Sequence, residues 1–593
     1  MKPLRPLLAR ARTLLARAVD LFPVTPLGLL VLAGAAFALF AYGLRRVDLV
    51  LLMMGGVALA LALSTTDANV WSALVTAVNT AGLVVGRRVV GDGIPVGAVV
   101  QSVKDATSFF LSVNATVSRT ANAIGLGTLA APYRTIGAAL SAVTSATRIV
   151  RILGNSGNEA TFADEKPYLV GTTLGGSTLA DGATFNVPKG VTVMIDAAAA
   201  IKLRAAVIDV GSSSGLVSRA GAAIQVLGTP TQKVQFTSFH DDSIGGDSDG
   251  VGPAVQGGQW GGIVLRRDSD SASRRVFLNS ISQATLRYGG GNVVVDSQLQ
   301  PFAPIHLEST RPTLAFNDIF SSAGAGISAD PNSFEDSNGR YGPEVRGNRL
   351  LDNTINGLFV RIRTAFGSSV DKLDVPARFK STDITYVIQE NLVIAGGAGG
   401  YLVNPATGLP EARATGRLVI DPGVVVKLMG ARIELERGNA QLIAEGTSQQ
   451  HVIFTSLGDR RYGAGGTFDT NGNSPDVRSP GDWSGIVVQD GSKASIDNAY
   501  IAYGGGQSAI EGGFDRFDTI EVHQGGLRLA NSRIEFNASG RSNGDRNARG
   551  TNDDSTVFAR GAQPVIVGND FRDNSGATMS VNANSFTNDA MPD

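Results

Sequence analysis

The sequence contains no cysteine, few charged residues and few aromatic ones. Without cysteine, the chain can form no disulfide, no thiolate nucleophile and no zinc or iron–sulfur site with cysteine ligands. Charged residues make up 17% of the 593 positions and aromatic residues 6%, and the net charge is −1. No basic surface with interleaved aromatic side chains is indicated, which argues against nucleic acid as a partner.

Glycine, in contrast, is abundant, with 73 residues. It supplies the positive φ angles that tight turns need, so this composition is typical of a turn-rich β structure rather than a helical one. From about residue 166, short runs alternate Val or Ile with polar residues, as in VPKGVTVMID (187–196) and IDPGVVVKLMGARIEL (420–435). Alternation with a period of two predicts strands with one buried face.

The long apolar runs of the chain lie near its N-terminus. A basic start precedes two uncharged segments, 26–44 and 49–66, which are separated by Arg45 and Arg46. A membrane span needs about 20 apolar residues, so residues 1–66 are predicted to anchor the chain in a membrane as a helical hairpin. The alternative is one signal-anchor helix followed by a buried helix, and the sequence leaves the topology open.

Residues 67–165 are rich in Ala, Val, Ser and Thr and are predicted to form a helical linker region. Within it, the segment 131–154 spaces its apolar residues near a period of 3.6. It is therefore expected to form amphipathic helices. They would lie on the membrane surface or pack against the end of the next domain.

The remainder of the chain is an internal duplication. Four landmarks recur in the same order and at a nearly constant offset. They are GTPTQKVQFTS (228–238) and GTSQQHVIFTS (446–456), Trp260 and Trp483 in the motif G-x-W-x-G-I, Tyr-Gly-Gly-Gly at 288 and 503, and GNRLLDN (347–353) and GNDFRDN (568–574). Two homologous segments are predicted, 166–382 and 383–593.

Strands without helices between them, in a chain rich in Gly and Asn, favour a solenoid in which each coil stacks on the previous one. Coils of about 20–25 residues would give on the order of 14–16 coils. Side-chain amides at the turns are then expected to bond along the solenoid axis. Two β-sandwiches are the alternative. The asparagines with this expected role are Asn348, Asn353, Asn569 and Asn574.

The elements GVTVMID, GTPTQKVQFTS and GQWGGI, with DPGVVVKL, GTSQQHVIFTS and GDWSGI, resemble the right-handed parallel β-helix domains, of the pectin lyase-like class, in large bacterial surface proteins. The resemblance covers roughly residues 166–587. It implies an all-β fold, a right-handed parallel β-helix of two tandem segments behind an α-helical membrane-anchor region. It implies little about activity, because the class includes polysaccharide lyases, hydrolases and adhesins.

An acidic insertion precedes each Trp motif, FHDDSIGGDSDGVGP (239–253) in one segment and LGDRRYGAGGTFDTNGNSPD (457–476) in the other. Carboxylate and amide oxygens are suitable ligands for Ca²⁺, so these insertions are candidate calcium sites. Solvated turn-rich loops are the alternative. The candidate ligands are Asp241, Asp242, Asp247, Asp249, Asp469, Asn471, Asn473 and Asp476.

Trp260 and Trp483 are candidate carbohydrate-stacking platforms, and their alternative role is to cover a coil in the core. The four histidines form no recognisable catalytic set, and no catalytic residue is assigned. A β-helix lyase, as the resemblance implies, would combine Ca²⁺-binding acids with an Arg or Lys base. Asp241 and Asp242 with Arg266 or Arg267 are the nearest candidates, and surface solvation is the alternative for these acids.

The sequence thus favours a membrane-anchored, non-catalytic module at the bacterial cell surface, with a structural, adhesive or carbohydrate-binding role. A polysaccharide lyase or glycoside hydrolase is the alternative. The expected partners are a membrane at the N-terminus, and polysaccharide or other surface proteins. Because the C-terminal residues are repeat-like and carry no evident capping helix, the chain is expected to continue in a longer protein or to meet a partner there.

Overall fold

The structure is a computed structural model that describes short pieces between residues 74 and 111 and then residues 132–586. The gaps in the longer range are 156–165, 338, 363–370, 398–400, 404–409, 413–415, 466, 473, 543 and 545. The predicted membrane segments 26–44 and 49–66 lie outside the described residues. Within the described residues, no helix is both long enough and apolar enough to cross a membrane.

The chain divides into two compact units, Met1–Tyr133 and Arg134–Asp593. The described part of the first unit is an antiparallel sheet with the strand order β1-β3-β2. The expectation of helix for residues 67–165 is wrong here, because Val100, Phe109 and Leu111 alternate into a buried face. The strands are β1 (Leu74–Val75), β2 (Val100–Asp105) and β3 (Ser108–Leu111).

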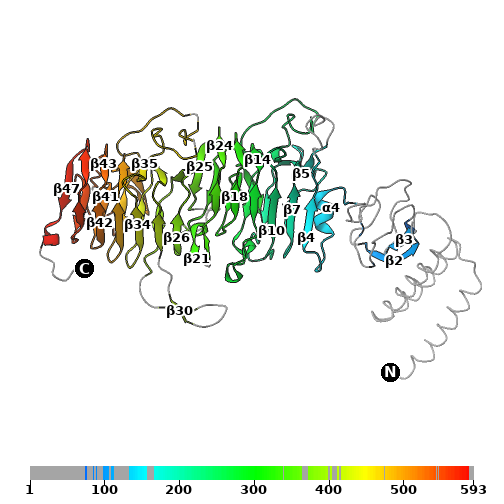
Figure 1. The fold of residues 1–593 in the computed structure, drawn as a ribbon, viewed down its shortest axis with the longest axis horizontal. Helices are drawn as coiled ribbons and strands as arrows, with labels where there is room; N and C mark the ends of the chain where they lie inside the picture. Colours follow the sequence, from blue (N-terminus) through cyan, green and yellow to red (C-terminus); the bar gives the residue numbers. More distant parts are fainter. Residues whose placement is uncertain are drawn as a thin grey trace, which may run out of the picture. The chain divides into compact units, whose positions relative to one another are not determined.

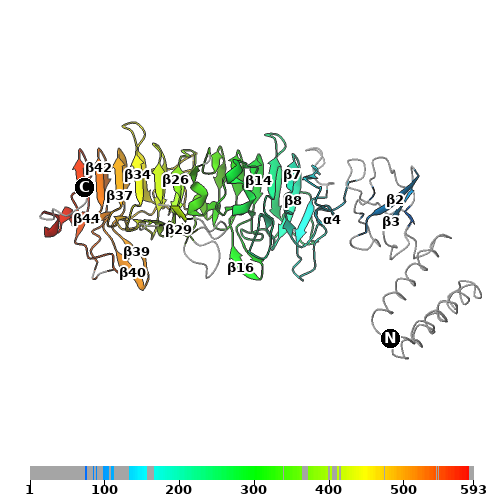
Figure 2. The same cartoon turned by 90° about the horizontal axis from the view of Figure 1, so that it is seen from below.

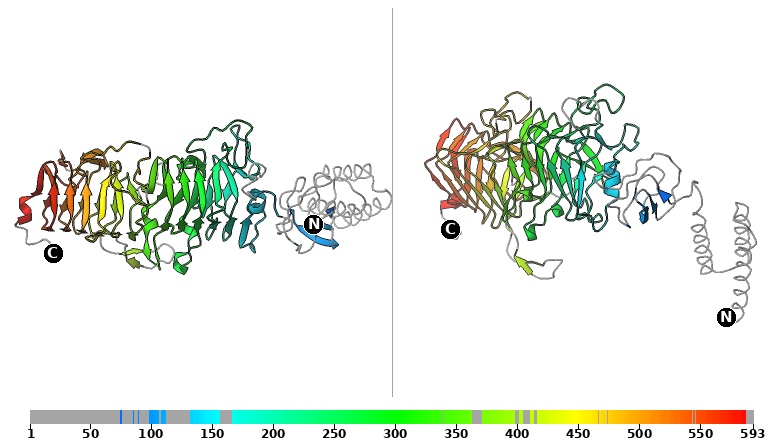
Figure 3. Two further views of the ribbon diagram at one scale, coloured as in Figure 1. Left: turned by 45° about the horizontal axis from the view of Figure 1, so that its top comes forward. Right: turned by 45° about the vertical axis from the view of Figure 1, so that its right-hand side comes forward.

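The second unit is a stack of parallel strands, and each coil of the stack contributes one strand to each of three faces (Figures 1 and 3). This arrangement supports the predicted solenoid. We name residues 149–360 the first copy and residues 376–581 the second copy. Each copy has six coils among the described residues.

One face is a single 12-stranded parallel sheet that runs through both copies, which we name the shared sheet. Its strands are β6 (Phe185–Asn186), β9 (Ile208–Val210), β12 (Ile263–Leu265), β17 (Ile305–Leu307), β20 (Ala325–Ala329), β25 (Ile355–Val360), β27 (Tyr386–Ile388), β32 (Val425–Leu428), β35 (Val452–Ser456), β38 (Ala499–Ala502), β43 (Arg533–Glu535) and β46 (Asp570–Arg572).

The other two faces are each divided into two 6-stranded sheets, one in each copy. The first strand of each coil lies in β4 (Ile149–Ile152), β7 (Thr192–Asp196), β10 (Ala223–Leu227), β13 (Ser280–Ser282), β18 (Thr313–Ala315) and β23 (Glu344–Arg346), or in β26 (Pro376–Phe379), β31 (Arg417–Ile420), β34 (Gln441–Glu445), β37 (Lys493–Asp497), β42 (Gly526–Ala530) and β45 (Val565–Val567). The remaining sheets are β5 (Tyr168–Gly171), β8 (Ala200–Arg204), β11 (Val234–Ser238), β14 (Ala284–Arg287), β19 (Asp318–Phe320) and β24 (Arg349–Leu351), and β28 (Leu392–Ile394), β33 (Ile433–Leu435), β36 (Ile486–Val488), β41 (Ile520–His523), β44 (Ser555–Arg560) and β47 (Ala577–Val581).

The two copies occupy different faces of the stack. The shared sheet takes the third strand of each coil in the first copy and the second strand of each coil in the second copy. In the part of the chain between β25 and β26 that the structure describes, one face is crossed with a single isolated bridge, Leu373 to Ile394, in place of a strand. Then β25 pairs with β27. The second copy is therefore turned by one face about the axis of the stack relative to the first.

The core is a set of continuous apolar rows inside the coils. Along the shared sheet, inward side chains are stacked by the strand register directly on their neighbours, which buries apolar surface without a break between the copies. One such row is Phe185, Ile208, Ile263, Ile305, Ile327, Leu358, Tyr386, Val426, Phe454, Ile501, Ile534 and Phe571.

The coils are longer and fewer than expected. The strand register shows how far the chain runs before it returns to the same face. Arg417 pairs with Gln441 in a coil of the expected length, but Thr192 pairs with Ala223 in a longer one. The coil that carries the first acidic insertion is longer still. Because most coils exceed the expected length, the described chain forms twelve of them, fewer than predicted.

The first copy also begins earlier than residue 166. Of the segment 131–154, predicted to be helical, only α4 (Ile136–Ser141) is a helix, and β4 follows it. The Thr135 hydroxyl caps α4, and Asp181 Oδ1 accepts from Ile136 N at 2.8 Å. Ile136 joins the core and α4 contacts β4 and β6, so the helix packs against the end of the stack, as the second of the two expectations had it.

The asparagine prediction is confirmed. Asn348 Oδ1 accepts from Asn317 N in the preceding coil, while Asn348 Nδ2 donates to Leu314 O at 2.9 Å. Asn353 makes the same pair of bonds to the preceding coil, and so do Asn569 and Asn574 in the second copy. Each amide thus satisfies one backbone donor and one backbone acceptor at a turn, where the strand ladder is interrupted.

Short antiparallel hairpins and 3₁₀ turns leave the coils. Two of the hairpins occupy equivalent positions directly after Tyr-Gly-Gly-Gly and project from the stack (Figure 2). They are β15 (Asn292–Val295) with β16 (Gln298–Pro301), and β39 (Gln507–Ile510) with β40 (Gly513–Arg516). The others are β21 (Asp336–Ser337) with β22 (Arg340–Tyr341), β29 (Tyr401–Val403) with β30 (Pro410–Ala412), and the turns η2 (Arg267–Ser269), η3 (Ala272–Arg274), η4 (Pro331–Phe334) and η5 (Ala583–Phe586).

Candidate functional site

The two tryptophans lie in the core. Trp260 and Trp483 are both 0% exposed. Each indole N–H donates to a backbone carbonyl of the next coil, Trp260 to Arg287 O at 2.7 Å and Trp483 to Ala502 O at 2.8 Å. In this structure neither ring offers a face to a sugar, and the position matches the alternative in which the Trp covers a coil.

The recurring motif lies where two neighbouring coils are in contact. The Tyr-Gly-Gly-Gly segment pairs with the Trp motif of the preceding coil, and Gly291 N donates to Trp260 O just as Gly506 N donates to Trp483 O. Gly290 and Gly505 have φ of 84° and 85°, and a Cβ on them would lie 1.8 and 2.0 Å from a carbonyl oxygen of the next coil. Only glycine fits there, so the repeated motif is structural.

The first acidic insertion gathers three of its predicted ligands. Carboxylate oxygens of Asp242, Asp247 and Asp249 lie within 4.8 Å of one another. Asp241 instead accepts from Thr237 and Ser243. The three gathered carboxylates have the donor type that a hard cation prefers, and calcium at this site remains a prediction.

A buried lysine of the preceding coil holds this insertion by hydrogen bonds. Lys202, on the outer face of β8, is fully buried, and its ammonium donates to Gly246 O at 2.5 Å and Ser248 Oγ at 2.8 Å. Burial lowers the pKa of Lys202, while the surrounding aspartates oppose that shift. The lysine therefore supplies an internal positive charge beneath the acidic loop.

The second insertion is anchored in the same way although its sequence differs. Lys427 is fully buried and donates to Phe468 O at 3.2 Å and Thr470 Oγ1 at 2.9 Å. Burial lowers the pKa of Lys427 to about 8. In both copies, a threonine of the next coil donates to an insertion aspartate, Thr237 to Asp241 and Thr455 to Asp459.

The predicted ligands of the second insertion make separate contacts, and a calcium site there stays a prediction. Asn471 donates to Pro475 O, and Asp476 pairs with Arg478. Asp469 engages through its backbone carbonyl, which accepts from Asn356 Nδ2 of the first copy. Asn473 lies outside the described residues. Sequence inspection missed the two lysines, although the strands AIKLR and VVKL carry them at the same place in each copy.

The residues proposed for a lyase are not brought together. Arg266 is buried and bonds to Asp209 Oδ1 at 2.6 Å and to Glu308 at 2.9 Å, whereas the cation nearest to Asp241 is Arg287, at 3.8 Å. Asp242 lies with the insertion aspartates. The combination of Asp241 and Asp242 with Arg266 is therefore wrong, because Arg266 belongs to an ion-pair row on the outer face of the shared sheet. The other candidate, Arg267, is an exposed residue of the turn η2.

The histidines are used in internal contacts. Arg204 Nε donates to His240 Nε2 at 3.3 Å, which leaves Nδ1 to donate to Asp249. His306 pairs with Glu308 on β17 and its continuation, and His523 pairs with Glu521 on β41. The two copies thus keep a His–Glu pair on equivalent strands with the two residue types exchanged, which favours a structural role for the pair.

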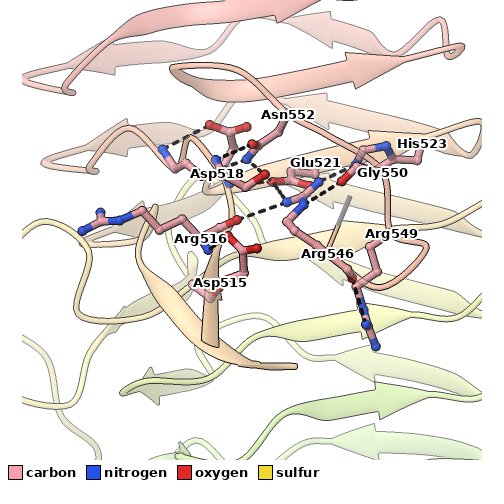
Figure 4. A network of polar contacts seen from close by, with 12 residues as sticks. Asp515, Arg516, Asp518, Glu521, His523, Arg546, Arg549, Gly550 and Asn552 are labelled. Atoms are coloured by element: carbon pink, nitrogen blue, oxygen red, sulfur yellow. Dashed lines mark hydrogen bonds and ion pairs between the residues drawn. The ribbon is translucent and has the colours of Figure 1, made fainter. Parts of the chain in front are cut away.

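A buried polar network surrounds Glu521 (Figure 4). Its carboxylate accepts from Arg546 Nη1 and Asn552 Nδ2, each at 2.8 Å, and contacts His523 Nε2 at 2.9 Å. Although burial favours the neutral acid, His523 and Arg546 lower the pKa of Glu521 to about 2. Burial and the charge of Glu521 raise the pKa of the neighbouring Asp518 to about 8.

Asp518 is expected to make stability depend on pH. The folded protein holds this proton up to about pH 8, whereas an unfolded Asp loses it near pH 3.8. The protonated Asp518 carboxyl therefore contributes fully to the free energy of unfolding below pH 3.8, and this contribution is lost as the pH rises through 8. We expect Asp518→Asn to remove roughly 2–4 kcal/mol of the fall in stability between pH 5 and 9, measured by denaturant unfolding. Asp573→Asn, at an exposed site, is the control, and equal pH slopes in both variants would contradict the assignment.

An open groove lies where the second insertion meets the turns of the first copy. Its volume is about 610 Å³. Hydroxyl, amide, carboxylate and backbone groups line it, with neither an aromatic nor a cationic side chain. The lining residues are Gly257, Ser321, Ser322, Ala323, Asp352, Asn353, Thr354, Asn471, Gly472 and Ser474.

Comparison with known proteins found no match to this chain. No family model matches the chain, and neither a curated protein nor a solved structure matches it, so the stack of parallel sheets is established by the structure of the chain itself.

Proposed function

We propose that this chain is a non-catalytic carbohydrate-binding module at a bacterial cell surface, built on a right-handed β-helix of the pectin lyase-like kind and held at a membrane by its N-terminal apolar segments. The observation that carries the proposal is the polar groove of about 610 Å³ between the turns of the first copy and the second insertion. Its volume is within the range of small-molecule sites.

The chemistry of the groove suits a neutral or weakly polar glycan. Ser321, Thr354 and Ser474 offer hydroxyl groups, and Asp352 offers a carboxylate. Sugar hydroxyls are both donors and acceptors, and such side chains can meet them in either role. Since no cationic side chain lines the groove, phosphate or sulfate esters are poorly matched to it.

The stack supplies a rigid support for the groove. The turn residues that line it are fixed by bonds to neighbouring coils, because Ser322 N donates to Asn353 Oδ1 and Asn356 N donates to Thr470 O. The second bond joins the two copies. A site fixed in this way needs little ordering on binding, which favours affinity. A structural or adhesive role for the stack is compatible with the same groove.

The duplication provides a matched test. Asp352 and Asp573 are equivalent residues, both exposed and with φ of 55° and 51°, but only Asp352 lines the groove. We expect Asp352→Asn together with Thr354→Ala to weaken glycan binding about 30-fold, because each of the two lost hydrogen bonds contributes about 1 kcal/mol. Asp573→Asn is expected to leave it unchanged. The measurement is binding to a glycan array followed by calorimetry with the best ligand.

Two results would overturn the proposal. If no glycan binds to the full-length protein, or if Asp573→Asn weakens binding as much as the groove variants do, the groove is not the site. Cleavage of an acidic polysaccharide, with or without calcium, would instead establish the lyase or hydrolase alternative.

A further inference from the structure

A second, smaller cavity lies beneath the first hairpin, β15–β16, and is separate from the groove. Its volume is about 180 Å³. Val293 and Val294 of the hairpin form one wall, and Val207, Asp209 and Ser213 of the coil below form the other. The Ser213 hydroxyl is buried and has no hydrogen-bond partner among the described residues.

The second copy shows what this space can hold. The segment 206–210 (AVIDV) corresponds to 431–435 (ARIEL), so Arg432 stands where the first copy has Val207. The segment 288–305 corresponds without a gap to 503–520, so Ser508 and Ala509 stand where the first copy has Val293 and Val294. Each of these three residues of the cavity wall therefore has a counterpart in the second copy.

In the second copy, a guanidinium occupies the corresponding space. Arg432 is 2% exposed, and its Nη1 donates to Ser508 Oγ at 3.1 Å and to Ala509 O at 2.6 Å. Its Nε donates to Glu434, the counterpart of Asp209, at 2.8 Å. The space under this hairpin thus accepts a planar polar group that bonds to the hairpin and to a carboxylate.

Among the described residues of the first copy, no side chain bonds to both the hairpin and Asp209, since Arg219 donates to Asp209 and to Gly211 O but not to the hairpin. Val207 is too short to reach the hairpin carbonyls, and it packs with Val293 and Phe302 at the rim of the cavity. What remains is a space lined by both apolar and polar side chains. A volume of this size corresponds to about six water molecules, and an engineered cavity of about 150 Å³ accepts benzene.

The buried charges in the walls are already paired, because Asp209 contacts both Arg219, which also lines the cavity, and Arg266. The other charged lining residue is Asp296, which is exposed at the turn of the hairpin. An anion entering the cavity would lose its hydration and find no unpaired cation, which is costly, and a cation would meet Asp296 only at the solvent-exposed turn. A neutral molecule that combines hydroxyl groups with C–H faces fits both the paired charges and the valine walls.

We propose that this cavity is a binding site for a small neutral polyol of three to six carbons. Ser213 Oγ and the Asn186 carboxamide, which also lines the cavity, would bond to its hydroxyl groups, and Val207 and Val293 would contact its carbon skeleton. The site is independent of the glycan groove, so it stands or falls separately from the proposed function.

The test is saturable binding of glycerol, erythritol and myo-inositol to the full-length protein, followed by ligand-observed NMR and by crystallography of soaked crystals. Ligands of this size are expected to bind with dissociation constants of roughly 0.1–10 mM. Ser213→Ala should weaken binding about 5–10-fold, because one hydrogen bond is lost. Val207→Arg, which reproduces the second copy, should abolish it. Ser177→Ala, at an exposed serine, is the control and should bind like the parent protein.

General stabilisation by polyols affects all variants alike, so only the difference between the parent protein and the cavity variants counts. If none of the three polyols binds saturably up to about 100 mM, or if binding persists in Val207→Arg, the proposal is wrong. If Val207→Arg fails to fold, Ser213→Ala decides the question: unchanged binding in that variant overturns the proposal, and weaker binding supports it.

Discussion

Trp483→Ala is expected to destabilise the second unit by about 3–5 kcal/mol, which is the usual cost of removing a buried large aromatic side chain. Trp483 has no exposed surface and belongs to the core that connects neighbouring coils. The substitution leaves a cavity and removes the donor to Ala502 O, whose carbonyl then lacks that partner. The measurement is the urea midpoint of unfolding.

Two companion variants separate packing from hydrogen bonding and from surface effects. Trp483→Phe keeps most of the volume, and its expected cost is about 1–2 kcal/mol for the lost hydrogen bond. Phe514→Ala removes an aromatic ring that is 73% exposed at the second hairpin and should change stability by less than about 0.5 kcal/mol. If Trp483→Ala leaves the urea midpoint unchanged but removes glycan binding, the stacking-platform alternative holds.

Arg546→Ala is expected to destabilise the protein by about 3–5 kcal/mol, because it leaves a buried carboxylate without its cation. Arg546 and Glu521 are both fully buried, and Nη1 lies 2.8 Å from Oε1. Arg546 also donates to Gly550 O at 2.7 Å and stacks on Phe517 at 4.6 Å, so it joins the 541–552 loop to β41 (Figure 4). Loss of the guanidinium releases that loop as well as the ion pair.

The sign of this effect can be checked by removing both charges. Arg546→Met with Glu521→Gln should be less destabilising than Arg546→Ala, because no unpaired charge remains buried. Arg541→Ala, in an exposed pair with Asp554, should change stability by no more than about 0.5 kcal/mol. Equal costs for the single and the double variant would show that the loop contacts, and not the charge, dominate.

The duplication and the axial asparagine bonds could be predicted because their signals are local. Asn348 and Asn569 stand at turns in matched sequence, and stacked coils bring such amides within reach of the preceding backbone. The prediction of helix at 131–154 held for α4 only, and it was wrong at Ile149–Ile152 because this short apolar run fits a helical period as well as strand alternation. Tertiary pairing with β7 decided between the two.

The candidate sites were harder to predict from the sequence. Lys202 and Lys427 look like exposed residues of half-buried strands, and each is buried only because the insertion that follows the next coil's strand folds back over it. Three of the four acids in the first insertion meet, whereas Lys427 and Asn356 hold the second insertion by its backbone and Thr470. Composition alone does not predict these contacts.

The sequence by itself determined that the chain repeats, that its strands have one buried face, and which turn residues bond along the axis. These follow from alternation and spacing, which act over a few residues. Only the tertiary structure decided that the second copy is turned by one face, since that depends on the crossing by a single bridge at Leu373, in the described residues between β25 and β26. The same rotation of the second copy places the second insertion against the first copy, where the groove forms. There Asn356 bonds to the insertion backbone at Asp469 and Thr470.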